Sequence, residues 1–207
     1  MPGAIPSSTH PNDSNPYLSD PDVLLMLDFQ KGNRASFENL MHKHYKRILN
    51  FIYRFTGIRE TAEDLTQEVF IKVYNSGPTY RPKAKFQTWI FTIAKNISLN
   101  ELRRFKNKPV SLDGTWETED GEMAPQVEDT RAPSPDQEII QDEKAVIVKA
   151  AIDALPENQR MAVILRRYED LSYEEIAKTM GCSVKAVKSL LNRAKENLRN
   201  KLAGFIS

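Results

Sequence analysis

LSYEEIAKTMGCSVKAVKSLLNR, residues 171–193, is the stretch that decides the fold of the C-terminal third of the chain. Ser172 with Glu175 three positions later is the pattern of a capping box, which predicts the start of a short helix. Gly181 permits the positive φ of a tight turn, and Ser183 is suited to cap a second helix. We expect the apolar side chains of this second helix to face inward: Val184, Val187, Leu190, Leu191 and Ala194. The segment therefore predicts a helix-turn-helix.

The opposite face of the second helix carries polar and cationic side chains, namely Lys185, Lys188, Ser189, Asn192 and Arg193. In a helix-turn-helix the second helix enters the DNA major groove, where cations meet phosphates and guanine, and Asn pairs with adenine. An ordinary helix pair with a solvated charged face would show the same side chains, so shape alone leaves both interpretations open. The caps and the turn at this spacing favour DNA binding.

Helical periodicity extends over most of the remaining chain. Apolar residues recur every three or four positions from residue 35 to 55, before Gly57, and again over 61–74, 86–106 and 137–168. An earlier helical segment starts at an N-cap at Asp20, followed by Pro21 and by the apolar residues Val23, Leu24, Leu27 and Phe29. No useful strand-like alternation appears, so we predict an all-α protein with two small helical domains. We expect a disordered extension over 1–20, a helical bundle over 21–109, an acidic flexible linker over 110–137 and the helix-turn-helix domain over 138–207.

The near-neutral net charge of +1 hides strong segregation. Residues 37–109 carry +8 and residues 144–207 carry +5, with −10 over residues 110–143 between them. Each basic block is suited to a polyanion because exposed charges act locally. No run approaches the ~18 apolar residues of a membrane span. The lone Cys182 and the absence of clustered ligands predict a cytosolic protein without a metal or cofactor; His42 and His44 face apart on a helix and are expected at the surface.

The segment FQTWIFTIAKNISLNELRR, residues 86–104, mixes aromatic and cationic side chains. Phe86, Trp89 and Phe91 cannot all point inward on one narrow stripe, so part of this aromatic surface is suited to stack on unpaired bases. Trp89 as a core residue is an equally open interpretation. We expect base contacts from Asn96 and Asn100, and phosphate contacts from five cations: Lys83, Lys85, Lys95, Arg103 and Arg104.

Three segments together resemble one family, the extracytoplasmic-function sigma factors of bacterial RNA polymerase. TAEDLTQEVFIKVY, residues 61–74, is similar to the family's core motif. Residues 86–104 look like its promoter-melting and minus-ten helix, and residues 155–199 resemble the domain that binds the minus-thirty-five element. The three occur in the family's order, over about residues 22–106 and 138–202, whereas residues 1–20 lie outside its pattern.

The resemblance implies a non-catalytic initiation factor that binds core RNA polymerase, through its beta and beta-prime subunits, and promoter DNA. The resemblance assigns docking on the polymerase to four residues, Glu63, Asp64, Gln67 and Glu68. It also implies that the helix at 86–104, with a base pocket formed partly by residues 80–85, binds the minus-ten strand. The helix-turn-helix would bind the minus-thirty-five duplex. The resemblance also implies an anti-sigma factor, which would leave the protein in the cytoplasm or held at the inner membrane face.

Other interpretations stay open at this point. A free-standing helix-turn-helix regulator would need no aromatic-basic helix at 86–104. An enzyme would need more than the carboxylate pair Asp64 and Glu68, which no nucleophile or ligand cluster accompanies. The acidic linker is either a polyanion mimic in the polymerase cleft or a solvated spacer, and Cys182 is either an oxidant sensor or an inert thiol.

Overall fold

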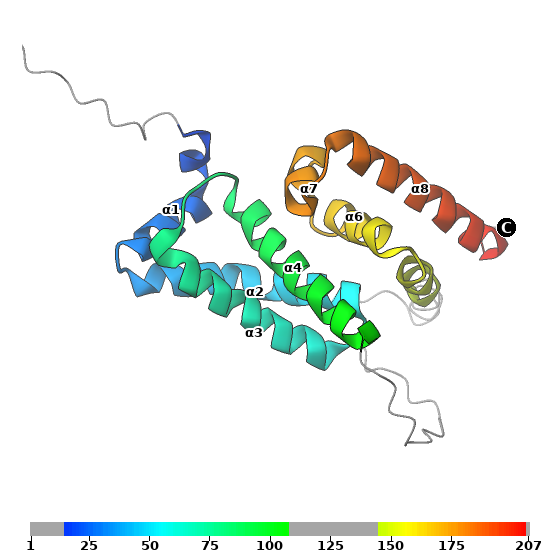
Figure 1. Ribbon diagram of the computed structural model, residues 1–207, viewed down its shortest axis with the longest axis horizontal. Helices are drawn as coiled ribbons and strands as arrows, with labels where there is room; N and C mark the ends of the chain where they lie inside the picture. The colour runs from blue at the N-terminus through cyan, green and yellow to red at the C-terminus, as the bar shows by residue number, and fades with distance from the viewer. Residues whose placement is uncertain (1–14, 108–144, 206–207) are drawn as a thin grey trace, which may run out of the picture.

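The computed structural model describes residues 15–107 and 145–205, which form helices and no strands. The all-α prediction is therefore confirmed for this part of the chain. Four α-helices and one short 3₁₀ turn make the N-terminal bundle: α1 (Pro21–Gln30), α2 (Arg34–Thr56), α3 (Arg59–Ser76), η2 (Gly77–Thr79) and α4 (Phe86–Asn107). In Figure 1 the long helices α2, α3 and α4 run side by side, and α1 lies across one end of them.

Local signals set most helix ends in this bundle. Asp20 caps α1, because its side chain accepts a hydrogen bond from the backbone N–H of Asp22. Asn33 caps α2 in the same way, and Gly57 ends α2 with a left-handed φ of 79°. The bundle buries a continuous apolar core between the helices, including Ile48, Phe51, Phe55, Leu65, Val69, Val73 and Ile90.

The expectation of a disordered extension over residues 1–20 is wrong for its last part. Residues Pro16–Ser19 form the 3₁₀ turn η1, and the side chain of Asn15 caps it by accepting a hydrogen bond from the backbone N–H of Tyr17. The Pro- and Ser-rich composition suggested disorder, but the Asn cap and the contacts of Tyr17 and Leu18 with the core give this turn a fixed place. Residues 1–14, the linker predicted over 110–137 and residues 138–144 lie outside the described part of the chain.

The C-terminal domain contains a helix at residues 145–153, followed by α6 (Glu157–Arg167), α7 (Tyr173–Met180), α8 (Val184–Leu202) and the turn η3 (Ala203–Phe205). The predicted capping box is present: Glu175 N–H donates to Ser172 Oγ, and Ser172 N–H donates to the Glu175 carboxylate. Gly181 has a left-handed φ of 68°, and Ser183 caps α8. The helix-turn-helix formed by α7 and α8 is thus confirmed.

The two domains pack against each other as one body. Figure 1 shows α4 between the N-terminal helices and the helix-turn-helix; α7 packs on α4, and α6 packs on α2. One apolar cluster runs across the boundary, from Phe55 and Phe91 to Leu165 and Leu171. The Arg160 guanidinium of α6 lies over the ring of Phe55 with 4.8 Å from its carbon to the ring centroid. The contacts between the domains are therefore apolar as well as ionic.

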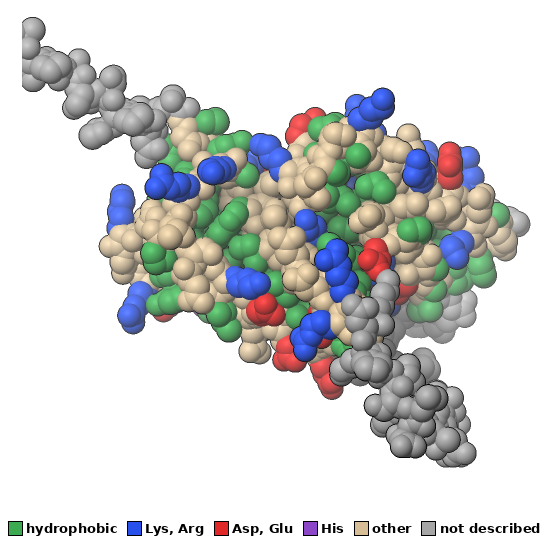
Figure 2. All heavy atoms as spheres, viewed as in Figure 1, with side chains coloured by type: hydrophobic (Ala, Val, Ile, Leu, Met, Phe, Trp, Pro, Cys, Tyr) green, Lys and Arg blue, Asp and Glu red, His purple; other side chains and the backbone are tan. Residues whose placement is uncertain are grey.

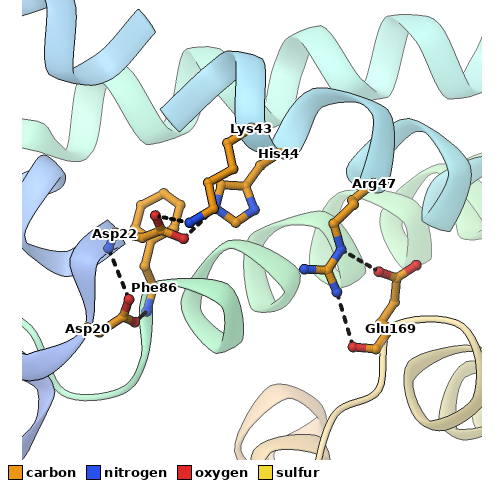
Figure 3. Close-up of polar contacts among 7 residues, drawn as sticks. All are labelled: Asp20, Asp22, Lys43, His44, Arg47, Phe86 and Glu169. Carbon is orange, nitrogen blue, oxygen red and sulfur yellow. Dashed lines mark hydrogen bonds and ion pairs between the residues drawn. The ribbon is translucent and has the colours of Figure 1, made fainter. Parts of the chain in front are cut away.

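A buried polar cluster ties α1 to α2 (Figure 3). His44 is buried, which corrects the expectation of a surface histidine, and its Nε2 lies 2.9 Å from Asp22 Oδ2. Lys43 Nζ donates to the other oxygen of the same carboxylate. Burial lowers the pKa of His44, and Asp22 partly offsets this effect. The periodicity of α2 places His44 on its inward face, and Asp22 supplies the polar partner that this buried ring requires.

Candidate nucleic-acid interface

The loop between α3 and α4 is fixed in place by the N-terminal residues of the bundle. A Cβ on Gly77 would lie 2.5 Å from the ring of Phe29, so this position requires glycine. Gln30 Nε2 donates to the carbonyl oxygens of Pro78 and Tyr80 at 3.1 and 3.2 Å. Asn15 Nδ2 donates to the carbonyl oxygen of Pro82 at 2.9 Å. The loop thus has a defined conformation although it contains no regular structure after η2.

The far end of this loop is held by a shared helix cap. Asp20 Oδ2 accepts a hydrogen bond from the backbone N–H of Phe86, the first residue of α4, at 2.9 Å (Figure 3). Its Oδ1 accepts from Asp22 N–H at 3.0 Å. One carboxylate therefore stands at the N-termini of both α1 and α4, where the helix dipoles favour a negative charge.

A cavity of about 570 Å³ opens between this loop and the first turns of α4. Its lining includes Arg81, Lys83, Thr88, Trp89 and Thr92. The Trp89 ring meets the buried ring of Tyr80 edge to face, with 4.9 Å between centroids. Burial raises the pKa of Tyr80 far above its ordinary value, with Asp20 adding to the effect, and its hydroxyl has no hydrogen-bond partner. A pocket with one aromatic wall and a cationic rim can hold an unstacked base beside its phosphate.

The three aromatic residues at the start of α4 do not share one role. Phe86 and Phe91 are fully buried, whereas Trp89 is half-buried, so the three rings do not all lie inside. The two buried rings pack on α2, with ring centroids 5.2 Å from His44 and 5.1 Å from Phe51 respectively. Trp89 packs against the core and also lines the cavity.

The predicted base-contact residues continue from the cavity along α4. Successive helical residues turn by about 100°, so Trp89, Asn96 and Asn100 fall within about 40° of one another. Asn96, Asn100 and Arg103 are exposed. Arg104 is also exposed and pairs with Glu101 at 2.9 Å. This arrangement forms a strip, Trp89–Thr92–Asn96–Asn100–Arg103, which we call the α4 strip.

Lys95 and Lys85 are placed differently from the other predicted cations. Lys95 lies about 120° around α4 from Trp89, and burial lowers the pKa of its ammonium group, with Cys182 of the helix-turn-helix partly offsetting this. Lys85 Nζ forms an ion pair with Glu175 of α7 at 2.9 Å. Both lysines therefore face the C-terminal domain in this structure. Lys83 remains exposed at the rim of the cavity.

The predicted docking residues lie together on the outer face of α3. Asp64, Gln67 and Glu68 are exposed, and Glu63 pairs with Arg59 at 3.0 Å. The face continues into an exposed apolar residue, Ile71, whose side chain is 58% exposed and which the sequence analysis did not single out. A carboxylate row beside an apolar patch can bind a partner helix that carries cations.

The five predicted residues of the second helix of the helix-turn-helix share one exposed face of α8: Lys185, Lys188, Ser189, Asn192 and Arg193. Val187 and Ala194 are fully buried on the opposite side, as predicted, whereas Val184, Leu190 and Leu191 are half-buried. On the side of the molecule drawn in Figure 2, Lys and Arg side chains lie over both domains and not in one cluster. On this side of the molecule the cations of the two domains therefore form no single basic patch.

The ion pair Arg47–Glu169 lies at the centre of the contact between the domains (Figure 3). Arg47 Nε donates to the buried Glu169 carboxylate at 3.3 Å, and its Nη2 donates to the carbonyl oxygen of the same residue at 3.1 Å. Gln87 of α4 donates to this carbonyl as well, at 3.1 Å. Burial raises the pKa of Glu169 to about 7, with Arg47 and Arg54 lowering it and Asp170 raising it.

Sequence reasoning missed the contribution of the other domain to the cavity. Lys178 of α7 lines it together with residues of α4 and the loop. No sequence signal links Lys178 to residues about 90 positions away. Thr88 and Thr92 were also missed, although they follow the same spacing of four residues that relates Asn96 to Asn100, whereas Arg81 lies in the segment 80–85 that was expected to form part of the pocket.

The described residues hold no cluster of three or more His, Cys, Asp or Glu side chains suited to a metal ion. Among the same residues, no helix is both long enough and apolar enough to cross a bilayer.

A two-domain helical protein with a base-sized cavity beside one exposed strip and a helix-turn-helix beyond it is a DNA-binding protein in its architecture. Comparison with known families agrees: the model of sigma-70 region 2 matches residues 40–108, and that of sigma-70 region 4 matches residues 145–198. The RNA polymerase sigma-H factor of Pseudomonas aeruginosa is 35% identical over 184 residues, covering 87% of this chain and 93% of that protein. The ECF RNA polymerase sigma-E factor of Escherichia coli K12 is 33% identical over 186 residues, covering 89% and 96%.

Solved structures share the fold. CnrH, solved in complex with the cytosolic domain of CnrY, superposes with a TM-score of 0.66 at 21% identity, over 89% of this chain and 99% of that one. The sigma factor RpoE of Bartonella quintana, solved with the anti-sigma factor NepR, gives a TM-score of 0.63 at 22% identity, over 81% and 96%. The chain belongs to the sigma-70 family of RNA polymerase sigma factors, within its extracytoplasmic-function group.

Proposed function

We propose that this sigma factor directs core RNA polymerase to a class of promoters and helps to open them, without catalysing a reaction of its own. Residues 21–109 and 138–207 serve as the two DNA-binding domains, and both act in the cytoplasm, where polymerase and chromosome meet. The observation that carries this proposal is the continuity of the cavity with the α4 strip. When a flipped base occupies the cavity, the following bases of the same strand lie beside Asn96, Asn100 and Arg103.

The minus-ten strand is held by two kinds of contact. Trp89 offers a stacking surface at the cavity, and Asn96 and Asn100 offer hydrogen bonds to base edges along α4. Lys83, Arg103 and Arg104 are exposed and neutralise phosphates. Lys85 and Lys95 join them only after α7 leaves α4, because both now face the C-terminal domain.

The other two surfaces bind separate partners. The α8 face with Lys185, Lys188 and Arg193 binds the minus-thirty-five duplex in the major groove. Glu63, Asp64, Gln67 and Glu68 on α3 dock on cationic side chains of the beta-prime subunit, with beta contacting the rest of the protein. In the described part of the chain both surfaces are accessible, since Asp64, Gln67 and Glu68 on α3 and the five predicted residues on α8 are exposed.

Run-off transcription tests the proposal directly. Purified full-length protein and core polymerase are incubated with a fragmented genome, and the transcripts are mapped. We expect specific transcripts that disappear with the double variant Asn96→Ala, Asn100→Ala. A matched control, Asn39→Ala, changes an exposed Asn on α2 and should leave them intact. Absence of any specific transcript with the native protein contradicts the proposal.

An anti-sigma factor is a second proposed partner. Two solved relatives of this fold are complexes, one of them with the anti-sigma factor NepR. A groove of about 520 Å³ between α2 and the helix at 145–153 is a suitable place, because Leu49, Tyr53 and Val148 give it apolar walls. The test is co-purification of tagged protein from its own cells. A bound protein that inhibits run-off transcription and is lost with Val148→Asp is expected; recovery of no inhibitory protein contradicts the idea.

A further inference from the structure

The short N-terminal segment ahead of α1 contacts both domains, and the functional assignment does not account for it. Asn15 holds the pocket loop through the carbonyl oxygen of Pro82, and Asp20 holds the start of α4 through Phe86 N–H. Between these two anchors, the Tyr17 hydroxyl accepts a hydrogen bond from Lys178 Nζ of α7 at 2.8 Å. Lys178 Nζ also lies 5.3 Å from the centroid of the Tyr17 ring.

These contacts place Lys178 at the opening of the candidate base pocket. Lys178 lines the cavity together with Trp89 and Thr92, and among the described residues it is the one lining residue contributed by the C-terminal domain. The ion pair between Lys85 and Glu175 lies on the same contact between α4 and the helix-turn-helix. A DNA strand that follows the α4 strip into the cavity must therefore compete with α7.

We propose that residues 15–20 form a clasp that holds α7 over the base pocket, so that the free protein is autoinhibited toward the minus-ten strand. The proposal rests on the function proposed above for the pocket. Within residues 15–107 and 145–205, the α3 docking face and the α8 face stay exposed while the clasp is closed. Polymerase and duplex DNA can thus bind the closed protein. Their binding to the two domains then separates α7 from α4.

The geometry explains why the clasp acts through Tyr17. Tyr17 is half-buried and its ring packs against the core, so the ring is held in place while the hydroxyl reaches α7. The N-cap at Asn15 and the cap at Asp20 fix the backbone on both sides of it. A fixed phenol loses little freedom when it binds Lys178, and this makes the contact more favourable than one between two mobile surface chains.

Cys182 provides a native probe of opening, because it is the one cysteine of the chain. It is half-buried in the turn between α7 and α8, packs against the core and lies near Lys95 of α4. A maleimide that carries a bulky dye needs more space than a half-buried thiol near Lys95 of α4 leaves. Its rate of reaction with the full-length protein therefore reports the open population, in the absence of polymerase and DNA.

The variants compared are Tyr17→Phe, which removes the hydroxyl and keeps the ring, Lys178→Met, and the two combined. We expect each single variant to be labelled roughly two- to fivefold faster, because a partly exposed hydrogen bond contributes about that much to an equilibrium. The double variant should gain little more, since both changes remove the same contact. Tyr45→Phe is the matched control, because Tyr45 stacks on Phe70 within the N-terminal bundle.

An unchanged rate for Tyr17→Phe overturns the clasp, as does an equal gain for Tyr45→Phe or full additivity in the double variant. Unfolding is not a concern for Tyr17→Phe, since it deletes one oxygen at a half-buried site, and equal thermal midpoints for all variants verify this. Because no DNA is present, failure of run-off transcription would refute the proposed function and leave the labelling result intact.

Discussion

The Asp20 carboxylate accepts a hydrogen bond from the backbone N–H of Phe86, 66 residues away, while its other oxygen caps its own helix. This contact joins the N-terminus of α1 to the first residue of α4. Since Thr88, Trp89 and Thr92 follow within two turns, the direction of α4 at the candidate base pocket depends on Asp20. An acidic residue at the start of the domain thus orients the part of α4 that lines the candidate base pocket.

Replacement of Asp20 by Ala should therefore cost more than the loss of one helix cap. One cap is worth ~1 kcal/mol, so we expect a loss of about 2 kcal/mol in the free energy of unfolding, measured with urea. Affinity for a single-stranded minus-ten oligonucleotide from a mapped promoter should fall as well. Ser183→Ala, which removes one cap at α8, should cost half as much in stability and leave the oligonucleotide affinity unchanged. Equal losses in the free energy of unfolding for the two variants would show that the hydrogen bond from Phe86 N–H to Asp20 does not stabilise the protein.

Charge reversal on α3 should separate polymerase binding from DNA binding. For Asp64→Lys combined with Glu68→Lys we expect affinity for core polymerase to fall at least about tenfold, because attraction to cations becomes repulsion. Binding of the minus-thirty-five duplex should stay as in the native protein. Glu38→Lys reverses one exposed charge on α2, which is half of the charge change made on α3, and serves as the control. Parallel loss of both activities would contradict the division of roles between α3 and α8.

Lys188→Ala should weaken binding of the minus-thirty-five duplex and reduce its dependence on salt. If Lys188 contacts one phosphate, the slope of log K against log salt should fall by about one unit. Lys201→Ala removes the same charge from the last turn of α8, about 140° around the helix, and should leave the slope unchanged. Fluorescence anisotropy at several salt concentrations measures both. An unaltered slope and affinity would remove Lys188 from the interface.

The contact between the domains should weaken as pH rises. Glu169 has a pKa of about 7 in the closed protein, against 4.5 for an exposed carboxyl group, because burial disfavours its charge. The closed form therefore binds more protons than the open form, and the stabilisation from Glu169 is complete below pH 4.5 and lost as pH rises through 7. Small-angle scattering should show a larger radius of gyration at pH 8 than at pH 6.

Glu169→Gln isolates this effect from other titrations. His44 acts in the opposite sense, since burial lowers its pKa and its protonation at low pH destabilises the bundle. The glutamine variant keeps the His44 titration and loses that of Glu169, so its radius should change less between pH 6 and pH 8. The same pH response in both proteins would exclude Glu169 as its source.

Local sequence determined the helices and their ends. The capping box at Ser172 and Glu175, the positive φ of Gly181 and the cap at Asp20 depend on neighbours within three residues, and the structure shows each of them as predicted. The exposed face of α8 follows from helical spacing alone for the same reason. Periodicity also placed Asn96 and Asn100 on one exposed face of α4, because that relation involves a single helix.

Contacts between distant segments were decided by the tertiary structure. Phe86 and Phe91 are buried against His44 and Phe51 of α2, and Lys85 and Lys95 turn toward the second domain, which packs on α4. The fixed conformation of residues 15–20 depends on Pro82 and Lys178, which lie 67 and 161 positions away from their partners in this segment. No local pattern encodes where these two residues lie. Helical spacing is a property of a few adjacent residues, whereas burial and ion pairing depend on which surfaces the folded chain brings together.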